Sequence, residues 1–280
     1  MGRTYHWLCQ SEIVLECVVN ISEGRDHTLL SALDAACGSD LLDRHTDGDH
    51  HRSVFTLVGE DSVRALVTLA VEKLNLDGHV GAHPRLGVID VVPFVPLADS
   101  SFDDAIRARD EFARWLTRTH EVPSFLYGPE RTLPDIRRRA WTSLLPDVGP
   151  RHPHPFAGAA CVGVRDELVA YNCWLKKGTS LDTAREIARR VRQPRIRTLG
   201  LAVGDRVQVS MNLIEPFVLG PAEAVRAVDE ACREVGCSIE HNELVGLLSE
   251  RVLREIPRDM WRWLAVSEDR TVEYRLAERV

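Results

Sequence analysis

Short apolar segments rich in β-branched residues alternate along this chain with segments whose apolar residues recur at helical spacing. The segment "VLECVVNI" (residues 14–21) is of the first kind, and "SEGRDHTLLSALDAACG" (residues 22–38) follows it with Leu29, Leu33 and Ala36 on one helical stripe. "RSVFTLVG" (residues 52–59) and "EDSVRALVTLAVEKLN" (residues 60–75) repeat the pair. This alternation predicts an α/β (α+β) protein in which sheets are backed by helices.

The pattern continues to residue 178. "GVIDVVPFVPL" (residues 87–97) and "SFLYG" (residues 124–128) are predicted strands, and Ser101 with Asp104 three residues later marks the start of a helix. "TLPDIRRRAWTSLL" (residues 132–145) is a further predicted helix. "GPRHPHPFAG" (residues 149–158) is a loop because of its prolines and glycines, and "AACVGVRDELVAYNCWLKKG" (residues 159–178) predicts a hairpin that turns at residues 165–167.

A second, shorter cycle follows the joint near Gly178. It comprises a helix "LDTAREIARRVR" (residues 181–192), a hairpin that turns at Gly204 and Asp205, and a helix "PAEAVRAVDEACREVG" (residues 221–236). We therefore expect two sandwich subdomains, residues 1–178 and residues 179–280, each a β-sheet backed by helices.

Composition restricts the partners. The formal net charge of −7 argues against a nucleic-acid partner, which would need a basic face. The seven cysteines include no C-x-x-C pair, so neither a zinc ribbon nor a disulfide framework is indicated. The first residues contain no apolar leader, and no apolar stretch is long enough to span a membrane. We expect a cytoplasmic protein without a membrane partner.

Histidine is concentrated in three segments that lie between the predicted elements, "DRHTDGDHHRS" (residues 43–53), "DGHVGAHPRLGVID" (residues 77–90) and residues 149–158. Because a sheet holds its loops in fixed positions, we expect these segments to share one crevice. In the second segment His83 lies between Gly81 and Gly87 and directly before Pro84, which restricts its backbone.

Arginine accompanies each of these segments, as Arg52, Arg85 and Arg151. A guanidinium group suits the binding of a carboxylate through two parallel hydrogen bonds, although each arginine could equally pair with a neighbouring Asp. The cluster of Asp43, His45 and the residues that follow could alternatively hold zinc or iron. No H-E-x-x-H motif supports that metal site, and no P-loop or G-x-G-x-x-G motif supports a nucleotide cofactor.

Several of these motifs occur together, and in order, in a known family. "LECVVNISEGRD", "LLDRHTDGDHHRSVFTLVG", "GAHPRLGVIDVVPFVPL", "VPSFLYG" with "RTLPDIR", and "PDVGP" before "HPFAGA" precede "YNCWLKKGT", "VQVSMNLIEP" and "NELVGLL". The chain resembles the formiminotransferase family, without the cyclodeaminase domain to which that unit is fused in animals. The resemblance implies two α/β subdomains with a folate in the groove between them. It also implies transfer of a formimino group from N-formiminoglutamate to N5 of tetrahydrofolate in histidine degradation, by a homodimer that needs no metal.

The resemblance also assigns roles to residues. His83 falls in the family's catalytic G-x-H-P-R-x-G motif, and one imidazole can serve as both base and acid at neutral pH. Asp43 and His45 are expected to assist it, and tetrahydrofolate is the co-substrate. The residues expected to contact folate and the substrate carboxylates are Arg52, Arg85, Gly149, Pro150, Arg151, His154, Pro155 and Gly158.

The chain departs from the family at three positions near this site. Ala82, His45 and His51 stand where animal members have Glu, Asp and Asn respectively. A folate-dependent transferase that uses a different formimino or formyl compound is therefore an alternative, and a metal-dependent amidohydrolase is the alternative from another class.

Overall fold

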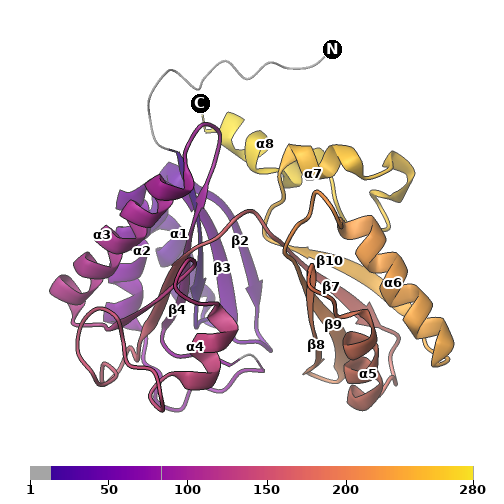
Figure 1. Ribbon diagram of the computed structural model, residues 1–280, viewed down its shortest axis with the longest axis horizontal. Coiled ribbons are helices and arrows are strands. Elements are labelled where there is room, and N and C mark those ends of the chain that lie inside the picture. Colours follow the sequence, from indigo (N-terminus) through magenta and orange to yellow (C-terminus); the bar gives the residue numbers. More distant parts are fainter. Residues whose placement is uncertain (1–13, 83, 280) are drawn as a thin grey trace. The chain divides into compact units, whose positions relative to one another are not determined.

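The computed structural model describes residues 14–82 and 84–279, which form two compact units (Figure 1). The first unit runs to Asp166 and includes Arg279, and the second comprises Glu167–Glu278. The chain thus passes from one unit to the other before Gly178, where the sequence places the joint, because the strand after residue 167 already belongs to the second sheet. Each unit is a sheet backed by helices, which confirms the predicted fold class.

The first sheet has six strands in the order β2-β3-β1-β4-β6-β5. Their bounds are β1 (Leu15–Ile21), β2 (Leu41–Asp47), β3 (Arg52–Val58), β4 (Ile89–Pro96), β5 (Ser124–Tyr127) and β6 (Ala160–Val164). Strand β1 is antiparallel to both β3 and β4, and β2 is antiparallel to β3. Strand β6 lies between β4 and β5 and is parallel to both.

The helices of the first unit are α1 (His27–Cys37), α2 (Glu60–Lys73), α3 (Phe102–His120) and α4 (Leu133–Arg139), with a short 3-10 turn at Gly38–Asp40. As the sequence predicts, Ser101 begins α3 with a capping box in which its hydroxyl and the Asp104 carboxylate each bind the other's backbone N–H. Thr132 and Asp135 do the same for α4. Helix α4 is shorter than predicted and ends at Arg139.

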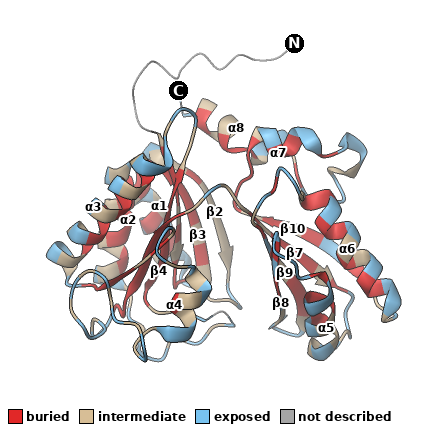
Figure 2. Cartoon of the chain, in the orientation of Figure 1, coloured by how far each residue is buried: buried red, intermediate tan, exposed pale blue. Residues whose placement is uncertain are grey.

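One face of the first sheet is apolar and lies under α1, α2 and α3 (Figures 1 and 2). Cys17, Val19 and Ile21 of β1 point into this core, so Val18 and Asn20 between them point to the other face. Helix α4 packs on that second face at the β5 and β6 side, where Ile136 belongs to the same apolar cluster as Phe125 and Cys161. Among the described helices of this unit, none packs on the second face over β1, β2 and β3.

The second sheet is antiparallel, in the order β10-β7-β9-β8. Its strands are β7 (Val169–Leu175), β8 (Ile196–Val203), β9 (Arg206–Leu213) and β10 (Ile239–Val245), and its helices are α5 (Leu181–Val191), α6 (Pro221–Glu234), α7 (Glu250–Glu255) and α8 (Val272–Ala277). Val203 pairs with Arg206, which confirms the predicted hairpin at Gly204 and Asp205. No helix in the described part of the chain is long and apolar enough to cross a membrane.

Two predictions of local structure are wrong. Residues 160–175 do not form a hairpin, because β6 pairs within the first sheet and β7 pairs with β9 and β10 in the second. Residues 43–47 do not lie between the strands and helices but belong to β2, a strand at the edge of the first sheet, so that His45 lies on a strand rather than in a loop.

Candidate active site

The second face of the first sheet carries polar side chains over β1, β2 and β3. Val54 of β3 lies opposite both His45 and Asn20, and Arg52 lies opposite Asp47, so the register places His45, Asn20 and Arg52 on the same face. Asp43, two residues before His45, shares that face. Its Oδ2 atom is buried and accepts no hydrogen bond from any described residue. A buried acceptor without a partner is energetically costly, so this oxygen is suited to accept a hydrogen bond from a ligand or from a residue that the structure does not describe.

A buried ion cluster lies beside these strands. Asp90 of β4 is completely buried, and it binds Arg52 through Nη1–Oδ2 at 2.6 Å and Arg137 of α4 through Nη1–Oδ1 at 2.8 Å. The backbone N–H of Leu86 donates to Asp90 Oδ1 at 2.8 Å. Burial alone would raise the pKa of the Asp90 carboxyl, but the two arginines outweigh it and hold that pKa at about 2. The cluster ties β3, β4 and α4 together and retains a net positive charge.

The segment that contains His83 is attached to the turn before β3 through Arg85. The Arg85 guanidinium donates from Nη2 to the His50 carbonyl at 2.9 Å and from Nη1 to the His51 carbonyl at 3.0 Å. Its Nη1 also lies 3.0 Å from His79 Nε2, and the ring of His79 stacks on that of His51 with 4.0 Å between centroids. His83 itself lies outside the described residues.

Glu23 organises the turn after β1. Its Oε1 accepts the backbone N–H groups of Gly24, Arg25 and Asp26 at 2.7–2.9 Å. Burial would raise the pKa of Glu23, but these N–H groups and the nearby His51 outweigh it and lower that pKa. Burial lowers the pKa of His51 and of His79, and each of these rings also has a positive neighbour that acts in the same direction. Both rings therefore favour the neutral state.

The loop of residues 149–158 packs against the segment that follows His83. Ala159 N–H donates to the Leu86 carbonyl at 2.9 Å, and Val88 N–H donates to the Ala157 carbonyl at 3.0 Å. Gly158 has a φ of 70°, and a Cβ atom on it would lie 2.2 Å from the Leu86 carbonyl oxygen, so a larger residue cannot replace it there. The structure thus brings the three histidine-bearing segments into contact, the first with the second and the second with the third.

The predicted folate-contacting residues divide into two groups within this loop. His154 and Gly158 exchange backbone hydrogen bonds at the end that contacts Leu86, with Pro155 between them. Gly149 instead packs near Thr117 of α3, and Pro150 and Arg151 follow it, with Arg151 exposed. Sequence reasoning did not identify Asp90, Arg137 or Glu23. The signal for Asp90 was present, since a charged residue inside the apolar strand "VIDVVPFVP" needs a buried partner.

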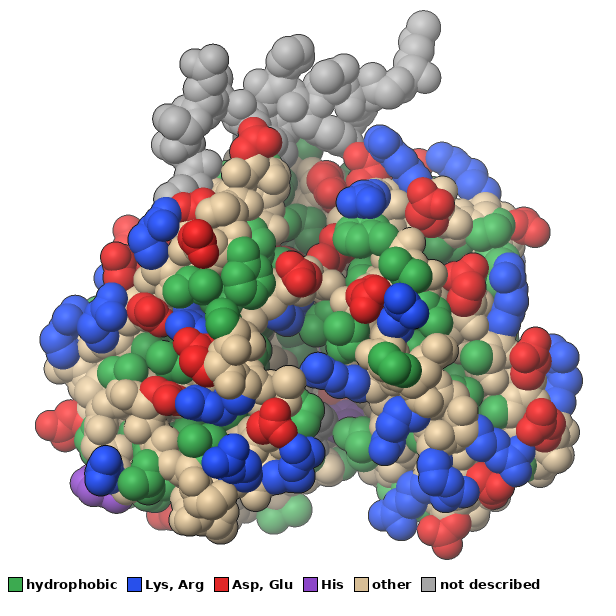
Figure 3. Space-filling model, viewed as in Figure 1, with side chains coloured by type: hydrophobic (Ala, Val, Ile, Leu, Met, Phe, Trp, Pro, Cys, Tyr) green, Lys and Arg blue, Asp and Glu red, His purple; other side chains and the backbone are tan. Residues whose placement is uncertain are grey.

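No group of three or more His, Cys, Asp or Glu residues is placed to hold a metal ion within residues 14–82 and 84–279. Lys and Arg alternate with Asp and Glu over the visible surface of both units (Figure 3). The positive charge of Arg52, Arg85 and Arg137 is therefore a local feature of the first unit.

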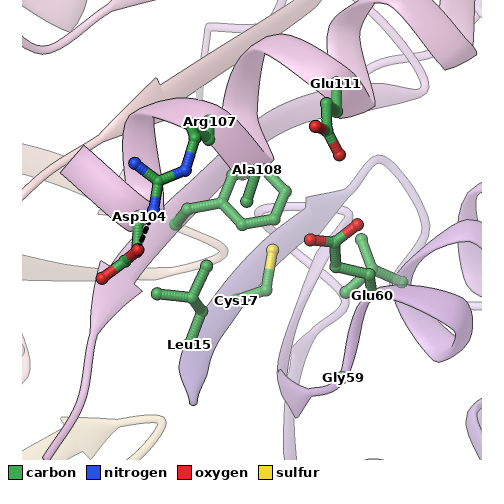
Figure 4. A pocket seen from close by; sticks show the side chains of 10 residues that line it. Leu15, Cys17, Gly59, Glu60, Asp104, Arg107, Ala108 and Glu111 are labelled. Atoms are coloured by element: carbon green, nitrogen blue, oxygen red, sulfur yellow. Dashed lines mark hydrogen bonds and ion pairs between the residues drawn. The ribbon is translucent and has the colours of Figure 1, made fainter. Parts of the chain in front are cut away.

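A pocket of about 200 Å³ lies elsewhere in the first unit (Figure 4). Its floor includes Cys17 and Phe94, which point to the helix-covered face of the sheet, and its rim includes Glu60 of α2 and Arg107 of α3, which pairs with Asp104. It is on the opposite face from Asp43 and His45 and at the other end of β1 from the histidine-bearing segments. None of the predicted site residues that the structure describes lines it.

Sequence comparison identifies the family. Residues 14–165 match the N-terminal subdomain of the formiminotransferase domain. Glutamate formimidoyltransferase of Streptococcus pyogenes is 31% identical over 87% of this chain and 91% of its own length. Glutamate formimidoyltransferase of Thermoplasma acidophilum is 30% identical over 88% and 91% of the two chains, and formimidoyltransferase-cyclodeaminase of Sus scrofa is 28% identical over 86% and 51%. The chain belongs to the formiminotransferase family.

Proposed function

We propose that the chain transfers a formimino group from N-formiminoglutamate to N5 of tetrahydrofolate and releases glutamate. The proposal is carried by the similarity to glutamate formimidoyltransferases over 91% of their length, together with the family match of residues 14–165, which contain the "GAHPRLG" segment. Tetrahydrofolate acts here as a co-substrate that accepts the one-carbon group.

In the proposed reaction, N5 of tetrahydrofolate attacks the amidine carbon and forms a new C–N bond. The tetrahedral adduct then loses the bond from that carbon to the glutamate nitrogen. His83 accepts the proton that N5 loses and donates a proton to the departing glutamate nitrogen, so that atoms and charge balance. An imidazole suits both steps because its pKa lies near neutrality.

Other residues are proposed to assist. Asp43 is proposed to orient the imidazole of His83, which is supported by its buried oxygen that has no partner among the described residues, and His45 lies on the same sheet face. Arg52 and Arg85 are proposed to attract the carboxylates of the donor and the folate, and the local excess of arginine over acid supports this role. The proposed folate contacts in the loop of residues 149–158 are Gly149, Pro150, Arg151, His154, Pro155 and Gly158. Holding two substrates together contributes a large part of such a rate.

We also propose that the enzyme acts as a homodimer in the cytoplasm, in the degradation of histidine, and without a metal. The residues Ala82, His45 and His51 favour a second candidate, in which the folate accepts its group from a different formimino or formyl amino acid. A metal-dependent amidohydrolase is the alternative from another class, and zinc or iron bound tightly to the purified protein would support it.

The test is a mass-spectrometric assay with tetrahydrofolate and N-formiminoglutamate that follows 5-formiminotetrahydrofolate and free glutamate together. Equal amounts of both products would establish the transfer. Binding of tetrahydrofolate without product would refute the proposed donor, and the same assay with other formimino and formyl amino acids would then identify the second candidate. Hydrolysis of the donor without folate would point to an amidohydrolase.

A further inference from the structure

We infer that Arg85 and Gly81 position the loop that carries His83 by attaching it to the turn before β3. This inference rests on the proposed function for the role of His83. Arg85 is then a positioning residue whose Nη1 and Nη2 bind two backbone carbonyls, and the carboxylate role proposed above reduces to the long-range attraction of its charge.

Arg85 follows His83 in the chain, and its contacts are with residues that precede His83. Nη2 and Nη1 reach the carbonyls of His50 and His51 at 2.9 and 3.0 Å, and Nη1 lies 3.0 Å from His79 Nε2. His79 and Arg85 are six residues apart in sequence, so this approach brings the two ends of the loop together. The Ala82 N–H donates to the Asp49 carbonyl at 3.3 Å and adds a further attachment to the same turn.

Gly81 provides the space for this arrangement. A Cβ atom on Gly81 would lie 2.3 Å from Arg85 Nη2 and 2.3 Å from the His50 carbonyl oxygen. Those two atoms are the donor and the acceptor of one hydrogen bond, so a side chain at position 81 would separate them. The requirement is for space and not for an unusual backbone conformation, because the φ of Gly81 is outside the left-handed region.

The turn that receives Arg85 is itself held in an uncommon conformation. His51 has a φ of 48°, which residues with a Cβ atom rarely adopt, and its Nδ1 accepts the Gly24 N–H at 3.1 Å. The stacked ring of His79 covers His51. Such local strain persists where the surroundings fix it, and it is frequent at functional sites.

The charges near Arg85 oppose a cation at this position, so its hydrogen bonds must account for the guanidinium group. Burial lowers the pKa of Arg85, and Arg52, Arg137 and Arg25 act in the same direction. The Asp90 carboxylate, which opposes them, is bound by Arg52 and Arg137. The planar guanidinium holds its N–H donors in fixed directions, which suits it to bind two carbonyls and approach a ring nitrogen at once. An ammonium group would keep the charge but not this geometry.

The test compares Arg85→Ala, Arg85→Lys and Gly81→Ala with two controls, Arg114→Ala on α3 and Gly48→Ala. Arg114 is exposed, and a Cβ atom on Gly48 would stay at 3.4 Å or more from its neighbours. Gly81→Ala removes no charge, so it separates positioning from binding of a carboxylate. For each variant, kcat and the KM of both substrates are measured, together with amide hydrogen exchange of peptides from residues 79–88 and 89–96.

We expect Arg85→Ala and Gly81→Ala each to lower kcat by about tenfold to a hundredfold, as misplacement of a catalytic group does, with KM changed less than about threefold. Exchange should accelerate in residues 79–88 but not in 89–96, and the controls should match the wild type. Arg85→Lys should fall between, and free guanidinium ion should restore part of the kcat of Arg85→Ala.

A large rise in KM for Arg85→Ala with unchanged kcat, or normal kcat for Gly81→Ala, would overturn the inference in favour of a substrate ligand. Unchanged exchange in both variants would overturn it as well. If the wild type does not act on N-formiminoglutamate, the proposed function fails, but the exchange comparison still decides whether Arg85 and Gly81 hold this loop.

Discussion

The two faces of the first sheet carry different kinds of side chain. The face under α1, α2 and α3 buries apolar residues, among them Phe55, Phe94 and Phe112. The opposite face, over β1, β2 and β3, presents Asp43, His45 and Arg52, side chains that are costly to enclose without partners.

The comparison shows how one strand can serve both purposes. Strand β1 alternates between Cys17, Val19 and Ile21 on the apolar face and Val18 and Asn20 on the polar face. Substitutions on the apolar face should therefore lower stability with little effect on catalysis. Substitutions on the polar face should lower activity with little effect on stability. Asp90 is the exception, because it is buried and charged at once.

The largest effect is expected on the polar side, for His83→Ala. Loss of a general acid–base residue should lower turnover by a hundredfold or more, within the usual range of about 10²–10⁴. The measurement is kcat with N-formiminoglutamate and tetrahydrofolate, with urea unfolding as the control. Stability should be unchanged, and near-normal turnover would remove His83 from the mechanism.

The matching substitution on the apolar face is Phe112→Ala in α3, where the ring is 1% exposed. It should lower the free energy of unfolding of the first unit by about 3–5 kcal/mol, through lost burial and the cavity left behind. Urea titration with hydrogen exchange of peptides from residues 14–166 measures the loss, and peptides from residues 167–278 serve as the internal control. A large fall in kcat per folded molecule would break the separation of the two faces.

Asp90 should make the stability of the first unit depend on acid. Its pKa is about 2 in the folded chain against an ordinary value of 3.8, so the folded state keeps the carboxylate charged to lower pH. The resulting stabilisation, about 2 kcal/mol, is complete above pH 3.8 and is lost as the pH falls toward 2. Urea midpoints between pH 5 and pH 2 measure it.

Asp90→Asn is the control for that titration, since it leaves Arg52 and Arg137 without their anion at every pH. The variant should be less stable at neutral pH and should lose less stability on acidification than the wild type. Equal acid sensitivity in both proteins would assign the effect to other carboxylates.

The smallest effect is expected at the start of α3. Ser101→Ala removes the hydroxyl that accepts the Asp104 N–H at 3.1 Å and should cost about 1 kcal/mol. Hydrogen exchange in the first turn of α3 reports it, while kcat should stay normal. An effect on kcat would mean that the apolar side is coupled to the polar side.

Local chemistry allowed much of this fold to be predicted. The capping box of α3 and the hairpin between β8 and β9 depend on residues close in sequence, Ser101 with Asp104 and Gly204 with Asp205. The pairing of β6 and β7 depends on partners far away, so the sequence between them predicted a hairpin that does not form. Strand β2 was not predicted, because its residues do not alternate between apolar and polar.

The candidate site could be predicted to a similar extent, where it depends on local sequence. The three histidine-bearing segments could be recognised because of their composition, and the structure brings them together. The partner of Arg52 could not be recognised, because Asp90 is 38 residues away in the chain. Arg137 could not be distinguished from Arg138 and Arg139, which follow it directly in the sequence. In the structure, Arg137 binds the buried Asp90 carboxylate.

The position of β2 at the edge of its sheet has a consequence for association between molecules. An exposed edge offers unpaired backbone groups to strands of other molecules, and charged side chains are a common defence. Asp43, Arg44, His45 and Asp47 give this edge such a defence, so Asp43 and His45, which are proposed to act in catalysis, would also help to keep the protein from aggregating. Apolar substitutions in β2 would therefore be expected to lower both activity and solubility.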